Sequence, residues 1–148
     1  MPRQREDDAG NVGVEHGRWG EDVASEFLRV HGYEIVERNV RPCRRDRRIE
    51  IDIVAYDRLY DMMVFVEVKQ HAKRSDRARR LASVDRRKLD LLRRGCRAWM
   101  RGMHWQGGYR FDVIEVYGAP RSPGAPEIDH IPNVRLFVKG DRFVDWAA

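Results

Sequence analysis

The sequence predicts a single α/β domain built on a mixed central β-sheet that is flanked by helices. Its 148 residues are enough for one domain, and the hydrophobic content of 42% is enough for one packed core. Apolar residues recur at helical spacing in two segments and alternate with polar residues in the segments between them. The resulting order is a helix, three strands, a second helix and further strands, which is typical of a mixed sheet covered by helices.

The first half of the chain contains the first helix and three strands. No apolar period is present at the start, so we expect a disordered tail over residues 1–12 and one domain over residues 13–148. Trp19, Val23 and Phe27 repeat at helical spacing before Gly32, which predicts a helix over residues 17–31. Alternation of apolar and polar residues predicts strands over residues 33–40, 49–54 and 64–69, with a basic loop at 41–48 and a turn at 57–61.

The second half of the chain contains the second helix and the remaining strands. Ser83 is a suitable N-cap for a helix that runs to about Arg101, with Leu92 and Cys96 facing inward. A fourth strand is predicted over residues 109–117. The stretch 118–132 holds four of the six prolines and is expected to be a long loop, and short edge strands are expected at 134–138 and 142–144.

The charge of the chain favours a polyanionic partner. Charged residues make up 36% of the sequence, and 29 Lys and Arg against 24 Asp and Glu give a net charge of +5. A basic balance of this kind points first to nucleic acid. No apolar run approaches the roughly 18 residues of a membrane span, so we expect a cytoplasmic protein without membrane contact. The two cysteines form no pair at metal-binding or disulfide-framework spacing, which disfavours a structural zinc site and a secreted disulfide scaffold.

Four charged side chains on two predicted strands carry the strongest chemical signal. Glu50 and Asp52 share one strand face, and Glu67 and Lys69 share one face of the next strand. In an antiparallel register where paired numbers sum to 119, Asp52 lies opposite Glu67. Directly opposed Cβ atoms are about 5 Å apart, so the two carboxylates would repel each other. A divalent cation between them would convert repulsion into binding, and oxygen ligands suit Mg²⁺ or Mn²⁺.

A structural alternative for these residues stays open. The four side chains would then line a solvated face held together by surface ion pairs, and the spacing alone favours neither interpretation. The register is also an assumption, because a slip of one residue would move Glu67 to the face opposite Asp52.

The residues that carry this signal also resemble a known family. The run Ile49–Val54 followed by Val64–Lys69 resembles the PD-(D/E)xK nuclease signature. The wider pattern is similar to the YraN-type family of uncharacterised bacterial proteins, which is related to archaeal Holliday junction resolvases; it includes Gly20-Glu21, Gly32-Tyr33, Arg38–Arg41, Val84–Lys88, Arg110–Ile114 and His130–Asn133. The resemblance implies a restriction-endonuclease-like fold. The chain departs from the family pattern at Ile49, where glycine is usual, and at Gln70-His71, where Thr-Arg or similar is usual.

The resemblance implies a role for each matching residue. Asp52 and Glu67 would be metal ligands for Mg²⁺ or Mn²⁺, Lys69 the catalytic lysine, and Glu21 an additional catalytic acid. Glu50 either binds a second metal ion or pairs with Lys69, with pairing favoured, and Gln70 is expected to support the metal ligands. The residues expected to contact nucleic acid are Arg41, Arg44, Arg45, Arg47, Arg48, Arg74 and Lys88.

The function expected from these observations is metal-dependent hydrolysis of DNA phosphodiester bonds, with branched or damaged DNA among the candidate substrates. The alternative is a non-catalytic nucleic-acid-binding module on the same fold, and a third hypothesis is a protein-interaction domain whose carboxylates are idle. A homodimer is a candidate assembly. The fold cannot decide among these hypotheses, because function resides in the site.

Overall fold

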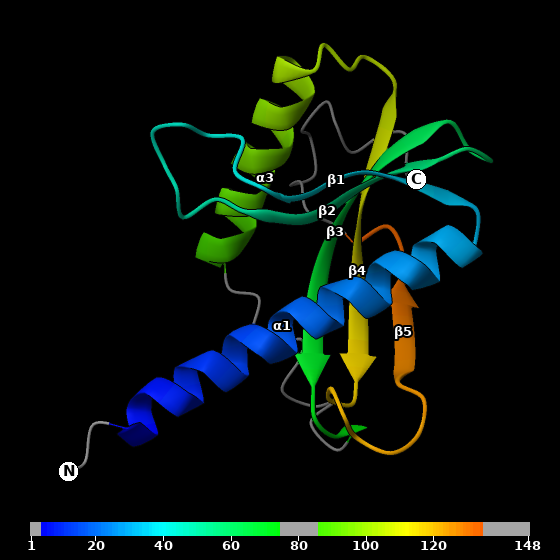
Figure 1. The fold of residues 1–148 in the computed structure, drawn as a ribbon. Coiled ribbons are helices and arrows are strands. Elements are labelled where there is room, and N and C mark those ends of the chain that lie inside the picture. Colours follow the sequence, from blue (N-terminus) through cyan, green and yellow to red (C-terminus); the bar gives the residue numbers. More distant parts are fainter. Residues whose placement is uncertain (1–3, 75–85, 135–148) are drawn as a thin grey trace.

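The computed structural model describes residues 4–74 and 86–134 and contains a five-stranded sheet with two helices (Figure 1). In chain order the elements are α1 (Gln4–Val30), β1 (Tyr33–Val40), β2 (Ile51–Asp57), β3 (Met62–His71), α3 (Arg86–Gly102), β4 (Gly108–Tyr117) and β5 (Glu127–Ile131). The strands lie in the order β1-β2-β3-β4-β5 across the sheet.

The sheet is mixed, as the sequence predicts. The pairs β1–β2, β2–β3 and β4–β5 are antiparallel, and β3–β4 is parallel. The parallel pair follows from the connection between its strands, because a chain that runs on through α3 returns to the same end of the sheet. This α/β architecture is the predicted one and is consistent with the restriction-endonuclease-like fold.

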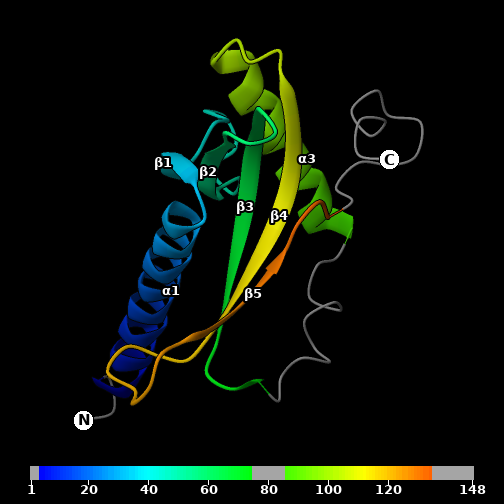
Figure 2. The ribbon, with the colours of Figure 1, turned by 90° about the vertical axis from the view of Figure 1, so that its right-hand side faces the viewer.

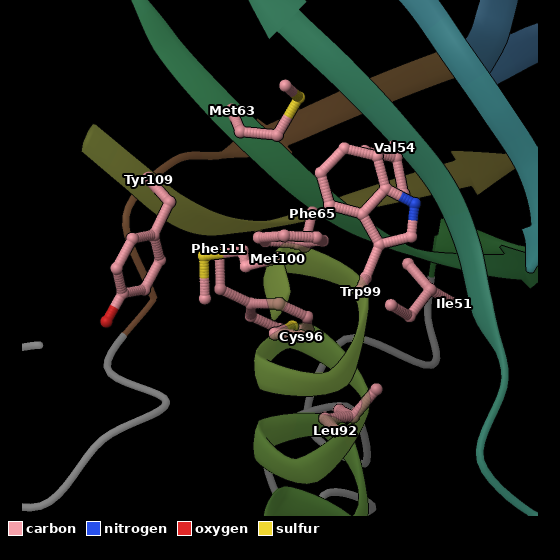
Figure 3. Close-up of a cluster of buried hydrophobic side chains, with 10 residues drawn as sticks. All are labelled: Ile51, Val54, Met63, Phe65, Leu92, Cys96, Trp99, Met100, Tyr109 and Phe111. Carbon is pink, nitrogen blue, oxygen red and sulfur yellow. The ribbon is translucent and has the colours of Figure 1, made fainter. Parts of the chain in front are cut away.

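The two helices cover opposite faces of the sheet (Figure 2). On one face Ala24 and Leu28 of α1 pack against alternate residues of the central strands, which are Ile53, Ala55, Val64, Val66, Ile114 and Val116. On the other face Trp99 of α3 packs in a cluster with Ile51, Val54, Phe65 and Phe111 of the strands (Figure 3). Both faces of the central strands are therefore buried, which explains why Ile53, Val54 and Ala55 are all fully inaccessible to solvent.

A glycine brings α3 unusually close to the start of β2. A Cβ atom added at Gly95 would lie only 2.6 Å from Cγ2 of Ile49, a separation that packed side chains do not tolerate. Ile49 is buried in this contact. The close approach places the first turns of α3 beside the residues that lead into β2, and it determines which side chains α3 contributes to the site.

Three differences from the sequence expectation are local. The structure extends the first helix back to Gln4, through residues 4–12 that were expected to be disordered, because residues without an apolar period can continue a helix whose later turns are packed. The predicted helix start at Ser83 lies outside the described residues, and so do the expected edge strands at 135–138 and 142–144, while Val134 is not in a strand.

The third difference is that the predicted loop at 118–132 contains the edge strand β5, so the loop prediction is wrong there. Pro126 precedes the strand and Pro132 follows it, and these prolines favoured a loop prediction. The strand has five residues and pairs only with β4. No helix in the described part of the chain is long and apolar enough to cross a membrane.

Candidate metal and nucleic-acid site

The register of the β2–β3 hairpin is the one assumed from the sequence. Val54 pairs with Phe65 and Asp57 with Met62, so the paired numbers sum to 119. Backbone pairing ends at Ile53 and Val66, just before Asp52 and Glu67. The Asp52 carboxylate instead accepts a hydrogen bond of 2.7 Å from the backbone N–H of Val68. Asp52 is thereby fixed at the point where the two strands stop pairing.

Two further acids reach Asp52 from other elements. Oxygen atoms of Glu21, Glu50 and Asp52 all lie within 4.8 Å of one another, and each of these side chains is half-buried. Glu21 belongs to α1, and Glu50 directly precedes β2. The structure thus brings Glu21, which the spacing of residues alone could not have placed, next to the predicted metal ligand Asp52.

The crowding of these acids changes their protonation. Burial and the nearby Glu67 carboxylate raise the pKa of Asp52 to about 8, against an ordinary value of 3.8. Burial also raises the pKa of Glu21, although a hydrogen bond with Asn39 and the charge of Arg38 oppose that effect. Three carboxylates in one half-buried place are destabilised when all of them carry a negative charge. A bound cation would compensate that charge.

Glu67 lies beside this acidic triad of Glu21, Glu50 and Asp52, and it is held by two lysines. One oxygen of Glu67 lies 3.1 Å from Nζ of Lys69 and 2.8 Å from Nζ of Lys88, and the Glu67 side chain is only 10% exposed. Burial, followed by the hydrogen bond with Lys88, lowers the pKa of Lys69. Burial acts to lower the pKa of Lys88 as well, but its hydrogen bonds with Glu67 and Lys69 outweigh that effect and the pKa is raised.

The favoured ion pair between Glu50 and Lys69 is wrong. Lys69 pairs with Glu67 on its own strand, and Glu50 instead accepts a hydrogen bond of 2.9 Å from Arg41. The reason is that Glu50 precedes β2, so it is not held opposite Lys69 by the hairpin. Glu50 is therefore available to the acidic triad.

A pocket of about 270 Å³ joins these groups to α3. Glu50, Asp52 and Glu67 line it together with Arg48 and Lys88, and Ile49, Leu91 and Leu92 form its apolar wall. Leu91 and Leu92 were not predicted from the sequence to line a pocket. Their spacing of three and four residues from Lys88 places them on the same flank of a helix, and that signal could have found them.

Two predicted site residues point elsewhere. The Gln70 amide donates a hydrogen bond to the backbone oxygen of Gly118, and its Cβ and Cγ atoms border Gly20 on α1, so Gln70 faces the other side of the sheet. Arg74 pairs with Glu127 and Asp129 at the edge strand β5. Neither residue lines the pocket, because residues 70 and 74 follow the stretch of β3 that forms it.

The loop at 41–48 places positive charge beside the pocket. Arg48 makes a two-contact ion pair with Asp46, of 2.9 and 2.7 Å, and also lines the pocket. Arg44, Arg45 and Arg47 are exposed, and within the described ranges 4–74 and 86–134 they make no ion pair. The predicted basic surface is therefore adjacent to the acidic triad, with three of its arginines free to contact an anion.

The donor set suits a hard divalent cation. It consists of carboxylate oxygens only, which Mg²⁺ and Mn²⁺ prefer, and a bound cation would offset the burial and the Glu67 charge that together raise the pKa of Asp52. Lys88 and Arg48 line the pocket, and Lys69 pairs with Glu67. The acidic group that can hold a metal ion therefore has cations beside it that can bind a phosphate group and stabilise negative charge on it.

Comparison with known proteins supports the family resemblance. Residues 20–116 match the model of the uncharacterised protein family UPF0102. The chain is 39% identical over 125 residues to a UPF0102 protein of Trichlorobacter lovleyi, covering 84% of this chain and 91% of that protein. It is 41% identical over 121 residues to one of Streptomyces griseus, covering 80% and 93% respectively. A UPF0102 protein of Koribacter versatilis is 40% identical over 102 residues, which cover 68% of this chain and 67% of that protein.

Proposed function

The chain belongs to the uncharacterised protein family UPF0102, and from that premise and the pocket we propose that it is a metal-dependent nuclease that hydrolyses DNA phosphodiester bonds. The observation that carries the proposal is the convergence of Glu21, Glu50 and Asp52 beside a glutamate that is bound to two lysines. These groups come from elements that are far apart in the sequence: Glu21 lies on α1, Asp52 on β2, Lys69 on β3 and Lys88 on α3. The fold itself therefore assembles the group.

The carboxylates are the metal-holding part of the proposed site. Asp52, Glu21 and Glu50 supply oxygen ligands, and Glu67 lies close enough to raise the pKa of Asp52 by its charge. A bound Mg²⁺ or Mn²⁺ would polarise a phosphate oxygen and acidify a bound water. The N–H of Val68 holds Asp52 in one orientation, which reduces the entropy that a ligand would otherwise lose on binding metal.

The two lysines are the phosphate-binding part of the proposed site. Lys69 and Lys88 share one oxygen of Glu67, so both ammonium groups lie beside that carboxylate, and Lys88 also lines the pocket. There they would stabilise negative charge that develops on the phosphate during hydrolysis. Burial and the hydrogen bond with Lys88 lower the pKa of Lys69, which makes proton exchange with water easier for Lys69 than for an ordinary lysine.

The exposed arginines of the loop at 41–48 are the substrate-holding part. Arg44, Arg45 and Arg47 would contact backbone phosphates on either side of the bond to be cut, which positions a strand without reading its sequence. A net charge of +5 supports the same kind of partner.

The test is a cleavage assay on a panel of duplex, flap, four-way junction and single-stranded DNA and RNA, with Mg²⁺, Mn²⁺ or EDTA. We expect cleavage of at least one DNA substrate that requires the metal ion. Loss of that activity in Asp52→Asn and its retention in Asp129→Asn, an acid at the far strand β5, would assign it to this pocket. A panel on which nothing is cleaved would contradict the proposal.

The second candidate is a nucleic-acid-binding module without turnover. The observation that favours it is the neutralisation of Glu67 by Lys69 and Lys88, which leaves that carboxylate outside the acidic triad among the described residues. Tight DNA binding by fluorescence anisotropy, combined with no cleavage under any metal condition, would select this function.

A further inference from the structure

A second cavity, larger than the first, lies at the other end of α3. Its volume is about 530 Å³, within the range of small-molecule binding sites. The residues that line it are Arg97, Met100, Arg101, His104, Trp105, Gln106, Gly107 and Tyr109. They belong to the last turns of α3, the connection to β4 and the start of β4.

This cavity is separate from the candidate metal site. Lys88 and Arg97 are nine residues apart on α3, which is about two and a half helical turns. The two side chains therefore leave the helix on opposite flanks. Lys88 faces the pocket of Asp52 and Glu67, and Arg97 faces the second cavity. A ligand in the second cavity would not touch the carboxylates.

The floor of the cavity is aromatic and rigidly held. Trp105 packs against the α3-side cluster, meets the ring of Tyr56 edge-on at 6.2 Å between centroids, and donates its indole N–H to the backbone oxygen of Gly108 at 3.0 Å. A Cβ atom at Gly107 would lie 2.5 Å from Cζ2 of Trp105, so only glycine at this position lets the indole lie against the chain. Met100 and Tyr109 complete an apolar floor, and they are labelled in Figure 3.

The rim of the cavity is cationic. Arg97 and Arg101 are one turn apart on the same helix flank, where like charges destabilise a helix. Arg101 and His104 are exposed and make no ion pair within the described part of the chain, and no acidic residue of that part lines the cavity. The partial negative charge of a helix C-terminus, about half an elementary charge, is outweighed by the full charge of Arg101. The rim therefore complements an anion.

We infer that this cavity binds a nucleotide unit, with its base on the Trp105 floor and its phosphate on Arg101 at the rim. A flat aromatic group attached to a phosphate matches an aromatic floor with a guanidinium rim, and stacking on aromatic side chains accepts any base. Guanidinium groups bind phosphate oxygens through paired N–H donors. The unit is either a free nucleotide or one nucleotide of a single strand, and the experiment separates the two sources.

The test is calorimetric titration of the full chain in EDTA with deoxyadenosine monophosphate, with deoxyadenosine, with inorganic phosphate and with a phosphorylated single-stranded DNA. We expect saturable binding of the monophosphate that exceeds the binding of either part. Tighter binding of the strand that Arg101→Ala weakens would identify a strand as the natural source, and equal binding would identify the free nucleotide. Because metal and cleavage are absent, this outcome does not depend on the proposed nuclease activity.

The variant Arg101→Ala tests the phosphate contact. Its side chain is exposed, so its loss should not affect folding. We expect about fivefold weaker binding of the monophosphate and unchanged binding of deoxyadenosine, the size expected for an exposed charged contact. Arg121→Ala, an exposed arginine that pairs with Glu15 and lines neither pocket, should change neither. The inference is overturned if the monophosphate does not bind saturably, if inorganic phosphate binds as tightly as the monophosphate, or if both variants weaken binding equally. A hexaglutamate peptide, an anion without a base, serves as a further probe, and tighter binding of this peptide than of the monophosphate would also overturn the inference.

Discussion

Asp52 is the residue at which burial, charge and hydrogen bonding meet in this protein. Its carboxylate accepts the N–H of Val68, lies within the acidic triad and has a pKa raised to about 8. A carboxylic acid with a pKa raised above its unfolded value is protonated more readily in the folded state. Its contribution to stability is therefore complete at low pH and is lost as the pH rises toward 8.

The first prediction concerns Asp52→Asn in metal-free protein. The asparagine oxygen can still accept the Val68 N–H, and the variant carries no charge that must be accommodated at high pH. We expect the variant to have a higher melting temperature than the wild type at pH 9 and a much smaller advantage at pH 5. Thermal unfolding in EDTA at both pH values measures this. Asp90→Asn, at an exposed site on α3, should show no such pH-dependent gain, and an equal melting temperature of Asp52→Asn and wild type at pH 9 would contradict the charge crowding.

The second prediction concerns Lys69→Met. Methionine preserves most of the aliphatic stem, and Lys88 still neutralises Glu67, so folding and DNA affinity should be nearly unchanged. The single-turnover cleavage rate at saturating DNA should fall by roughly a hundredfold, the effect of removing one group that stabilises charge in the transition state. Rapid-quench measurement on the best substrate of the panel tests it. Cleavage by the variant at the wild-type rate would make Lys69 a structural partner of Glu67.

At the scale of single residues, the sequence identifies what local alternation determines. Asp52, Glu67 and Lys69 could be assigned to one place because a hairpin register relates them, and the paired residues confirm that register. Glu21 lies 31 residues before Asp52 on a helix, so its approach depends on how α1 packs on the sheet, and only the family resemblance indicated it. Gln70 was misplaced because one further residue along a strand points to the opposite face.

At the scale of elements, the loop between β1 and β2 and the strand β4 have distinct roles. The loop contributes exposed positive charge next to the pocket, whereas β4 carries a buried polar network. In that network Arg110 donates to Asp57 at 2.7 Å and to Asp112 at 3.0 Å, and Asp112 also accepts from His130 and from the backbone N–H of Asn133. Asp112 is thus a buried structural partner of Arg110.

The third prediction concerns the loop. Replacement of Arg44, Arg45 and Arg47 by alanine should weaken DNA binding and also reduce its dependence on salt. Each lost phosphate contact removes about 0.9 from the slope of log affinity against log salt for duplex DNA, so the slope should become shallower by roughly 2 to 3. Fluorescence anisotropy between 50 and 200 mM salt, about the range in which such contacts dominate, measures it. Arg58→Ala, at the far hairpin tip and paired with Glu34, should leave the slope unchanged; an unchanged slope in the triple variant would exclude the loop from the interface.

The fourth prediction concerns Asp112→Asn in β4. Asp112 is fully buried, and its loss leaves Arg110 without one of its two acidic partners. Breaking a buried ion pair costs about 3 kcal/mol or more of unfolding free energy. Urea denaturation at pH 7 should show this loss, and Asp90→Asn should cost less than about 1 kcal/mol as an exposed pair. A wild-type midpoint for Asp112→Asn would show that the network contributes nothing to stability.

The pH dependence of that loss has a defined sign. Burial acts to raise the pKa of Asp112, but the donors His130, Arg110 and Asn133 outweigh it and the pKa is lowered. A lowered pKa stabilises the folded state above the unfolded pKa, and the contribution disappears as the pH falls through the folded value. The difference in unfolding free energy between the wild type and Asp112→Asn should therefore become smaller at acidic pH. A difference that becomes larger there would contradict the assignment.

At the scale of the whole molecule, the pattern of elements predicts the architecture because each core element has a strong period. The alternating runs became β2, β3 and β4, and the helical period of residues 86–102 became α3 against the sheet. The short strand β5 was missed because five residues between prolines give too little alternation to outweigh the loop signal. The positions of the two pockets on opposite flanks of α3 could not be predicted, since they depend on how α3 packs on the sheet.

The most direct test of the central claim is calorimetric titration of Mn²⁺ into the wild type, Asp52→Asn and the control Glu127→Gln, whose side chain lies on β5 and pairs with Arg74. The acidic triad should give one saturable site in the wild type, and removal of one anionic ligand should weaken it by about tenfold or more. Glu127→Gln should bind Mn²⁺ as the wild type does. Equal affinity in wild type and Asp52→Asn would place the metal elsewhere and contradict the account.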